Sequence, residues 1–200
     1  LIVNELTSEA LIQQIVADKV YYQSSQGGVT FTGGEVTLYP KFMSQIVSRC
    51  FDEGIHITIE TCGSYAYTRW ESILKKVQLI YFDLKIMDDA KHRLATGSSN
   101  HQILKNSKIL AENDFPVEFR FVLVEGYTDG QENLDAILAF LKSVKKTKLH
   151  LLRYHNMGQS KIDLISGEQK RLALKNYDLK KYQNIKDSFI SKGIDIIENS

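Results

Sequence analysis

The strongest constraint on the fold of this chain is the alternation of short strand-like runs with helix-like segments. The strand-like runs are rich in β-branched and aromatic residues, and several are nearly continuously apolar, which is typical of parallel strands covered on one face or both. Because helical patterns separate these runs, the chain is predicted to form right-handed parallel βαβ units. The predicted strands are Val29–Thr32, His56–Thr61, Leu79–Lys85, Glu118–Val124 and Lys148–Tyr154.

Apolar residues recur at helical spacing in the segments around these strands, so that each set shares one helix face. Cys50 and Trp70 belong to such faces and are predicted to be core residues. Periodicity alone leaves two architectures open, a doubly wound sheet and a partial barrel, and in both of them ligands bind beyond the C-terminal ends of the strands. The predicted faces are Leu11, Ile12, Ile15, Val16 and Val20; Phe42, Met43, Ile46, Val47 and Cys50; Trp70, Ile73, Leu74 and Val77; Leu134, Ile137, Leu138 and Leu141; and Leu179, Tyr182, Ile185 and Phe189.

The segment 27–36 reads Gly-Gly-Val-Thr-Phe-Thr-Gly-Gly-Glu-Val, so that a β-prone run ends in two glycines and a carboxylate. Gly33 and Gly34 permit backbone conformations that are closed to other residues, and they let a ligand approach the main chain. Exposed carbonyls together with the Glu35 carboxylate form a receptor for an ammonium group, which carries donors only. The alternative interpretation is a tight turn capped by Glu35.

Charged residues also lie at the C-terminal ends of other predicted strands. Asp83 and Lys85 are two positions apart in one strand, so both side chains point to the same face. Opposite charges within an apolar strand are costly unless each has a partner or faces a polar cavity. Two interpretations follow, a structural ion pair between these residues or a ligand site. Glu60, Arg120 and His155 lie at or just beyond the ends of other strands.

Composition is that of an ordinary enzyme domain. With 200 residues, 43% of them hydrophobic and 24% charged, the chain can bury one core and is predicted to form a single domain over residues 1–200. The net charge of +1 argues against a nucleic acid or a membrane surface as the main partner. No apolar run approaches the roughly 20 residues of a membrane span. Cys50 and Cys62 show no pairing pattern, which favours the reducing cytoplasm.

Several blocks of this sequence resemble the glycyl-radical-enzyme activating enzymes, a family within the radical S-adenosylmethionine (SAM) superfamily. The segment Gly27–Glu35 is similar to the family's Gly-Gly-Val-Thr-x-Ser-Gly-Gly-Glu motif. The resemblance implies an α/β fold, an open (β/α) partial TIM barrel of the radical SAM type, with its first strand missing from this chain. The other blocks are Ile59–Gly63, Phe82–Lys85, His92 with Thr96-Gly97-x-Ser99-Asn100, Arg120–Asp129 and Leu152–Gly158. In the third of these, Asn100 is expected to cap the helix that follows.

Members of this family carry a Cys-x3-Cys-x2-Cys loop near the N-terminus, whose three thiolates bind a [4Fe-4S] cluster. This chain has only Cys50 and Cys62, which lack ligand-like spacing, and it begins at Leu1 rather than at methionine. No metal ligand is therefore assigned within it, and the cluster ligands are expected to lie outside this chain. We expect an N-terminally truncated fragment that is inactive by itself.

The resemblance also implies a SAM site at the C-terminal ends of the strands. In similar enzymes the residue matching Asp83 helps to hold a monovalent cation beside the SAM carboxylate, and the residue matching Lys85 contacts SAM. Glu60 stands where the family usually has aspartate, and its longer side chain would displace or remove this cation. Arg120 is placed to meet the cofactor carboxylate or the peptide substrate, and His155 matches a histidine that contacts SAM. The implied SAM-binding residues are Gly33, Gly34, Glu35, Glu60, Thr61, Asp83, Lys85, Arg120 and His155.

The activity implied by the resemblance is the formation of a glycyl radical on a partner enzyme such as pyruvate formate-lyase. A reduced [4Fe-4S] cluster cleaves SAM, and the resulting 5′-deoxyadenosyl radical removes a hydrogen atom from a glycine loop of the partner. A flavodoxin or a ferredoxin-type protein would supply the electron. Two alternatives are a radical SAM enzyme that acts on a small molecule and a cluster-less relative that serves as a binding module. Sequence upstream of Leu1 would separate them, since a cysteine loop there indicates an enzyme.

Overall fold

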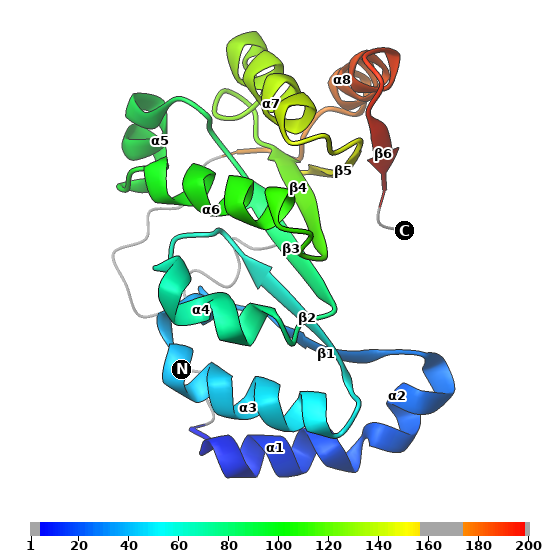
Figure 1. Ribbon diagram of the computed structural model, residues 1–200. Coiled ribbons are helices and arrows are strands. Elements are labelled where there is room, and N and C mark those ends of the chain that lie inside the picture. The colour runs from blue at the N-terminus through cyan, green and yellow to red at the C-terminus, as the bar shows by residue number, and fades with distance from the viewer. Residues whose placement is uncertain (1–4, 157–173, 199–200) are drawn as a thin grey trace.

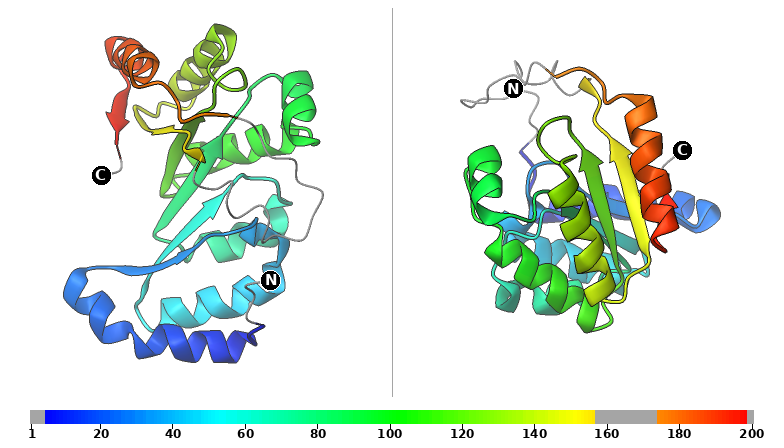
Figure 2. Two further views of the ribbon diagram at one scale, coloured as in Figure 1. Left: turned by 180° about the vertical axis from the view of Figure 1, so that it is seen from behind. Right: turned by 90° about the horizontal axis from the view of Figure 1, so that it is seen from above.

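The computed structural model, which describes residues 5–156 and 174–198, consists of one curved sheet with helices on its convex face (Figures 1 and 2). The six strands are parallel, and their order in the sheet is their order in the chain. Among the described residues β1 and β6 form opposite edges, so the barrel is open, as predicted. The strands are β1 (Gly28–Phe31), β2 (His56–Thr61), β3 (Leu79–Leu84), β4 (Val117–Leu123), β5 (Lys148–Arg153) and β6 (Asp195–Ile197).

The five strands predicted from the sequence are confirmed, with ends that differ by one residue at most. Thr32 and Lys85 lie just beyond β1 and β3 rather than within them. The sixth strand, β6, was not predicted. It has only three residues, which is too short for a periodic pattern to be recognised, and it is defined by its pairing with β5.

Helices make up most of the described chain between the strands. Helix α1 packs against α3 and thus forms an outer layer at the β1 end of the sheet (Figure 1). No helix in the two described segments is long and apolar enough to cross a membrane. The helical elements are α1 (Ser8–Ala17), α2 (Lys19–Ser25), the 3-10 turn η1 (Val36–Leu38), α3 (Pro40–Asp52), α4 (Tyr67–Leu74), α5 (Asp89–Thr96), α6 (His101–Glu112), α7 (Gln131–Ser143) and α8 (Leu179–Ser191).

The apolar faces predicted for α3, α4 and α7 are buried almost as expected, and Cys50 and Trp70 are core residues. Two residues that were predicted to lie on buried helix faces are exposed instead. Val20 is 71% exposed because α1 ends at Ala17 and a separate helix, α2, carries Val20 away from the shared face. Leu179 is also exposed, because it is the first residue of α8 and lies on a turn that does not reach the core.

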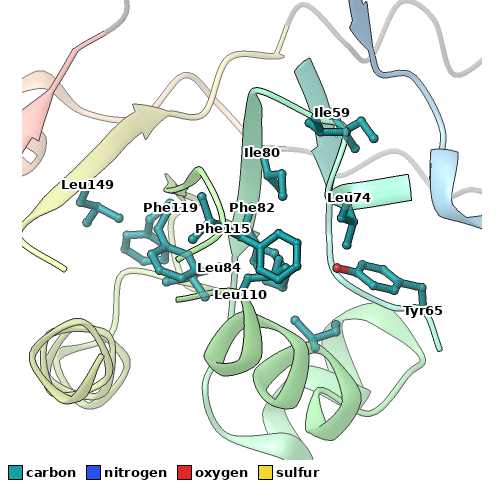
Figure 3. Close-up of a cluster of buried hydrophobic side chains, with 14 of the residues drawn as sticks. Ile59, Tyr65, Leu74, Ile80, Phe82, Leu84, Leu110, Phe115, Phe119 and Leu149 are labelled. Atoms are coloured by element: carbon teal, nitrogen blue, oxygen red, sulfur yellow. The ribbon is translucent and has the colours of Figure 1, made fainter. Parts of the chain in front are cut away.

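Alternation along β3 divides the sheet into an apolar and a polar face. Ile80, Phe82 and Leu84 are buried against the helices, and Figure 3 shows them in one cluster with Leu110 of α6 and Phe119 of β4. The rings of Phe82 and Phe119 meet edge to face, with their centroids 5.8 Å apart. The intervening residues of β3 project from the opposite, concave face. Polar side chains on the concave face are therefore not packed against the helices and can line a ligand site.

Gly63 controls the path of the chain as it leaves β2. Its φ is +80°, and a Cβ atom placed there would lie 2.0 Å from the ring of Phe82. Any other residue would therefore both strain the backbone and collide with the core. This close approach holds the segment that begins at Cys62 against the end of β2, where the concave face opens.

Candidate functional site

A hollow of about 270 Å³ lies at the C-terminal ends of β1, β2, β3 and β4. Eight of the nine residues that were predicted to bind a ligand line this hollow. In the described part of the chain the ninth, His155, is exposed after β5 and does not line the hollow. The block that contains His155 ends with Met157 and Gly158, which lie outside the described residues. The lining residues are Thr32, Gly33, Gly34, Glu35, Glu60, Thr61, Cys62, Asp83, Lys85 and Arg120.

Glu35 joins the turn after β1 to the end of β2. Its Oε1 accepts hydrogen bonds from the Thr37 amide (3.2 Å), the Thr37 hydroxyl (2.6 Å) and the Thr61 hydroxyl (2.8 Å), and its Oε2 accepts one from the Cys62 amide (2.8 Å). Burial opposes ionisation of this carboxyl, but the hydrogen bonds from Cys62, Thr37 and Thr61 outweigh it and lower the pKa of Glu35.

The interpretation of Glu35 as a turn cap is therefore confirmed, since it is the N-cap of η1. A carboxylate offers about four acceptor positions over its two oxygens. Among the described residues, Oε1 accepts three donors and Oε2 accepts the Cys62 amide, while the Cys62 thiol also hydrogen-bonds to this carboxylate. Oε2 is therefore the oxygen with more room for a donor from a ligand. The receptor role proposed for Glu35 thus stays a prediction that its geometry permits.

Only one of the two adjacent glycines is required by the conformation of the turn. Gly33 has a φ of +121°, which residues with side chains rarely adopt, whereas Gly34 has no such φ. A Cβ atom at either position would meet no protein atom within 4 Å, because both residues border open space. The ligand-approach role predicted for Gly34 is therefore compatible with the structure, and it is untested.

Arg120 of β4 lies between two carboxylates from neighbouring strands. Its Nη1 is 2.7 Å from Glu60 Oε1, and both Nη2 and Nε are 2.9 Å from Asp83 Oδ1. The guanidinium also lies over the Tyr81 ring, 5.2 Å from the centroid. Glu60 accepts a second bond from the Thr32 hydroxyl at 2.7 Å. Side chains from β2, β3 and β4 and from the residue after β1 thus contribute to one polar network on the concave face.

The electrostatics of this network favour its charged form. Burial alone would raise the pKa of Glu60, but the hydrogen bonds from Thr32 and Arg120 and the charge of Arg120 lower it. Burial likewise opposes the charge of Arg120, and Glu60 and Asp83 outweigh it and raise the pKa of the guanidinium. Glu60 and Arg120 thus hold each other in the ionised state.

The alternative ion pair between Asp83 and Lys85 is not what the structure shows. Asp83 is paired with Arg120, which lies directly opposite it in the parallel register of β3 and β4. Within residues 5–156 and 174–198, Lys85 has no ion-pair partner, and its exposed side chain borders the hollow. Its charge is consequently available to a ligand.

The two cysteines do not fit a metal cluster. Cys50 is fully buried in the core, and burial raises the pKa of its thiol. Cys62 lines the hollow, but burial and the neighbouring Glu35 raise the pKa of its thiol to about 11. Metal ligation by cysteine requires the thiolate, which these surroundings disfavour. Among the described residues no group of three or more His, Cys, Asp or Glu side chains is arranged to hold a metal ion.

Sequence reasoning missed two lining residues and misjudged one partner. Thr32 could have been found because it ends a predicted strand and directly precedes the Gly33 turn. Cys62 follows the end of β2 and could have been found in the same way. Asn100 is at the N-cap position of α6, but its amide instead donates to the carbonyls of Ile86 and Met87. Its predicted capping role was therefore wrong, because the loop after β3 competes for the same side chain.

Comparisons with known proteins point to one family. Residues 3–141 match the family described as the radical SAM superfamily. The chain is 35% identical over 188 residues to the trans-4-hydroxy-L-proline dehydratase activating enzyme of Clostridioides difficile, covering 92% of this chain and 62% of that protein. It is 34% identical over 182 residues to the pyruvate formate-lyase-activating enzyme of Clostridium pasteurianum, covering 90% of this chain and 76% of that protein.

A solved structure supports the same relationship. A domain of pyruvate-formate lyase-activating enzyme from Bacteroides vulgatus is 27% identical to this chain, with a TM-score of 0.71, and the match covers 87% of this chain and 99% of that domain. The chain thus spans nearly all of one such domain, but it spans less than two thirds of the dehydratase activating enzyme.

Proposed function

Because the chain belongs to the radical SAM superfamily, we propose that it forms the SAM-binding part of an activating enzyme that generates a glycyl radical on a partner enzyme. The two curated relatives described above are both activating enzymes. The observation that carries the proposal is the convergence of eight residues matched to the family's SAM site around one hollow at the strand ends. Such strand ends are where barrels of this kind bind ligands.

The lining residues suit the amino-acid end of SAM. A volume of 270 Å³ is slightly below the roughly 300–1,000 Å³ of pockets that hold a whole drug-sized ligand. Glu35 Oε2 and the carbonyls near Gly33 and Gly34 would accept hydrogen bonds from the ammonium group. Lys85 would donate to the carboxylate, with Arg120 beside it. When bound next to a reduced [4Fe-4S] cluster, SAM supplies the radical chemistry that removes a hydrogen atom from a glycine.

The two cysteines of this chain do not suit the cluster, so we propose that its ligands are cysteines outside these 200 residues. The chain alone, reconstituted with iron and sulfide, would then hold no stoichiometric cluster and would not cleave SAM. A monovalent cation near Asp83 would have to displace Arg120, because the guanidinium is already 2.9 Å from Asp83 and 2.7 Å from Glu60.

We further propose a pyruvate formate-lyase-like partner, a flavodoxin or ferredoxin-type reductant and a cytoplasmic location. The name of the Clostridium pasteurianum relative supports the partner. The glycine loop of the partner would enter at the concave face, since the convex face is covered by helices (Figure 2). The presence of two unpaired cysteines supports a reducing compartment.

The proposal is tested with the protein expressed together with any residues that its gene encodes before Leu1 and after Ser200. The protein is purified without oxygen, supplied with iron, sulfide, dithionite and SAM, and mixed with pyruvate formate-lyase. Electron paramagnetic resonance should show a glycyl radical, with about one 5′-deoxyadenosine released per radical. Asp83→Asn should reduce both signals, whereas the control Glu112→Gln, which alters an exposed ion pair with Lys108 on α6, should not.

Each alternative has its own outcome in this experiment. Cleavage of SAM without a radical on pyruvate formate-lyase or on any other glycyl radical enzyme tested would favour a small-molecule substrate. Failure of the longer protein to hold a cluster and to bind SAM in calorimetry would favour a binding module. Either result contradicts the proposed function.

A further inference from the structure

The backbone that follows β3 is held by side chains rather than by the sheet. The register between β3 and β4 ends at Leu84, one residue before Lys85. Beyond that point Asn133 of α7 donates from Nδ2 to the Lys85 carbonyl at 2.9 Å, and its Oδ1 accepts from the Met87 amide at 2.8 Å. The Asn133 side chain thus supplies the hydrogen bonds that hold the backbone where the strand pairing ends.

The same side chain connects a third segment. Asn133 Nδ2 also donates to the carbonyl of Thr128, at 2.9 Å, in the loop between β4 and α7. On the other side of residues 85–87, the buried Asn100 donates from Nδ2 to the carbonyls of Ile86 (2.9 Å) and Met87 (2.8 Å). Two asparagines, separated by more than thirty residues, therefore fix these three backbone units.

Packing holds part of this segment, because the Ile86 side chain is buried and Met87 packs against the core. Residues 85–87 separate the hollow from a larger cavity of about 760 Å³ between α5 and α7, which is lined by Ile86, Met87 and Asn133 among others. Lys85 itself is exposed and borders the hollow, so packing does not hold its side chain. The backbone at Lys85 consequently depends on the hydrogen bond from Asn133, while Asn100 holds the next two residues together with this packing.

The chemistry at position 133 requires an amide. Its nitrogen faces two carbonyl oxygens and its oxygen faces an N–H group, so both ends of the side chain are matched. Aspartate would place an oxygen against the Lys85 and Thr128 carbonyls, and alanine would remove all three bonds. Either change would loosen the base of the Lys85 side chain.

We propose that Asn133 is a positioning residue for the Lys85 ammonium group at the SAM site. The inference rests on the proposed function, because it assumes that Lys85 contacts SAM. Asn133 does not line the hollow and acts only through the backbone of residues 85–87. A displacement of about 1 Å in a group that orients a substrate is enough to cost on the order of 100-fold in activity.

A double-mutant comparison of SAM affinity, measured by calorimetry on the cluster-loaded protein, tests this role. Lys85→Met should weaken binding by about tenfold or more in the wild-type background, because it removes a charge-assisted hydrogen bond. In an Asn133→Ala background the same change should weaken binding less than about threefold, because Lys85 is no longer held in place. An undiminished effect of Lys85→Met in that background would overturn the inference.

Asn113→Ala is the matched control. Asn113 also donates from Nδ2 to a backbone carbonyl, that of Ile109 at 2.8 Å, but it lies at the end of α6, away from residues 85–87. In this background Lys85→Met should keep its full effect. If Asn133→Ala does not fold, Asn133→Asp carries the same comparison, since it keeps the acceptor for Met87 and loses both donors.

Hydrogen exchange of the Met87 amide gives a readout that needs no SAM. Exchange should be faster in Asn133→Ala than in the wild type, and it should be unchanged in Asn113→Ala. Unchanged exchange in Asn133→Ala would show that Asn133 does not hold the backbone of residues 85–87. A different outcome is that exchange responds as expected while Lys85→Met has no effect on SAM binding in any background. In that case Asn133 does hold the backbone, but the proposed contact of Lys85 with SAM is wrong, so the two failures are distinguishable.

Discussion

Replacing Arg120 with methionine should destabilise the fold, because the substitution leaves Glu60 and Asp83 without the cation that they share. The side chain of Arg120 is 14% exposed and those of the two carboxylates are 25% exposed, so water cannot fully replace the lost partner. Methionine keeps most of the apolar stem of arginine, which limits the effect to charge and hydrogen bonding.

The magnitude follows from the degree of burial. Removing one partner of a fully buried ion pair costs about 3–5 kcal/mol, whereas exposed pairs contribute about 0–1 kcal/mol. Since both carboxylates retain some solvent contact, we expect a loss of about 2–3 kcal/mol, between those two limits. For a domain of this size such a loss lowers the Tm by about 5–10 °C.

Urea and thermal unfolding at pH 7, followed by circular dichroism, measure this loss. Lys85→Met is the control and should change the unfolding free energy by less than about 0.5 kcal/mol, as is usual for an exposed residue outside an ion pair. The triple variant Glu60→Gln/Asp83→Asn/Arg120→Met should recover most of the stability, because it removes the stranded charges. A Tm of Arg120→Met equal to that of the wild type, or a larger loss in Lys85→Met, would show that Asp83 is neutralised by Lys85 instead.

Three further predictions concern Glu35, Cys62 and acid stability. Glu35→Gln replaces one acceptor oxygen with a donor that faces other donors, so urea titrations should show that the unfolding free energy falls by about 1–3 kcal/mol. The control Glu71→Gln, which alters an exposed ion pair at α4, should keep the unfolding free energy within about 0.5 kcal/mol of the wild type. Cys62, with a thiol pKa of about 11 against an ordinary value of 9.0, should react with iodoacetamide at pH 8 about 100-fold more slowly than a free cysteine; modification at the free-cysteine rate, detected by mass spectrometry, would refute the environment assigned to it. The pKa values of Glu35 and Glu60 are lowered from 4.5, so these carboxylates stabilise the fold above that pH and stop doing so as the pH falls below it. Between pH 5 and pH 3, the unfolding free energy of Glu35→Gln should therefore fall less than that of the wild type. An equal fall in both proteins would contradict this prediction.

Much of the fold was predictable because strand and helix faces are encoded by local spacing. The alternation of runs fixes which segments are strands, and apolar residues at helical spacing identify buried faces such as that of α3. The failures occur where local spacing stops being informative. Val20 fits the periodicity of α1, but the break at Asp18 starts a new helix. The three residues of β6 acquire their identity from pairing with β5.

The members of the candidate site were predictable for a topological reason. In a parallel sheet the C-terminal ends of successive strands lie at one edge, so residues at those ends are brought together whatever their separation in the chain. Their pairing was not predictable. Asp83 and Lys85 are close in sequence, but the partner of Asp83 is Arg120, which is 37 residues away and is set by the register of β3 and β4.

Glu35 shows why two interpretations of one residue need not compete. From the sequence, a turn cap and a receptor for an ammonium group were alternatives, since each accounts for a carboxylate after two glycines. In the structure Oε1 accepts three donors from Thr37 and Thr61, Oε2 accepts the Cys62 amide, and the Cys62 thiol also hydrogen-bonds to the carboxylate. Bonds that lower the pKa of this group also keep it ionised and fix its orientation, which is what a receptor for a cationic ligand requires. The cap therefore prepares the binding group, and a substitution that weakens one role should weaken the other.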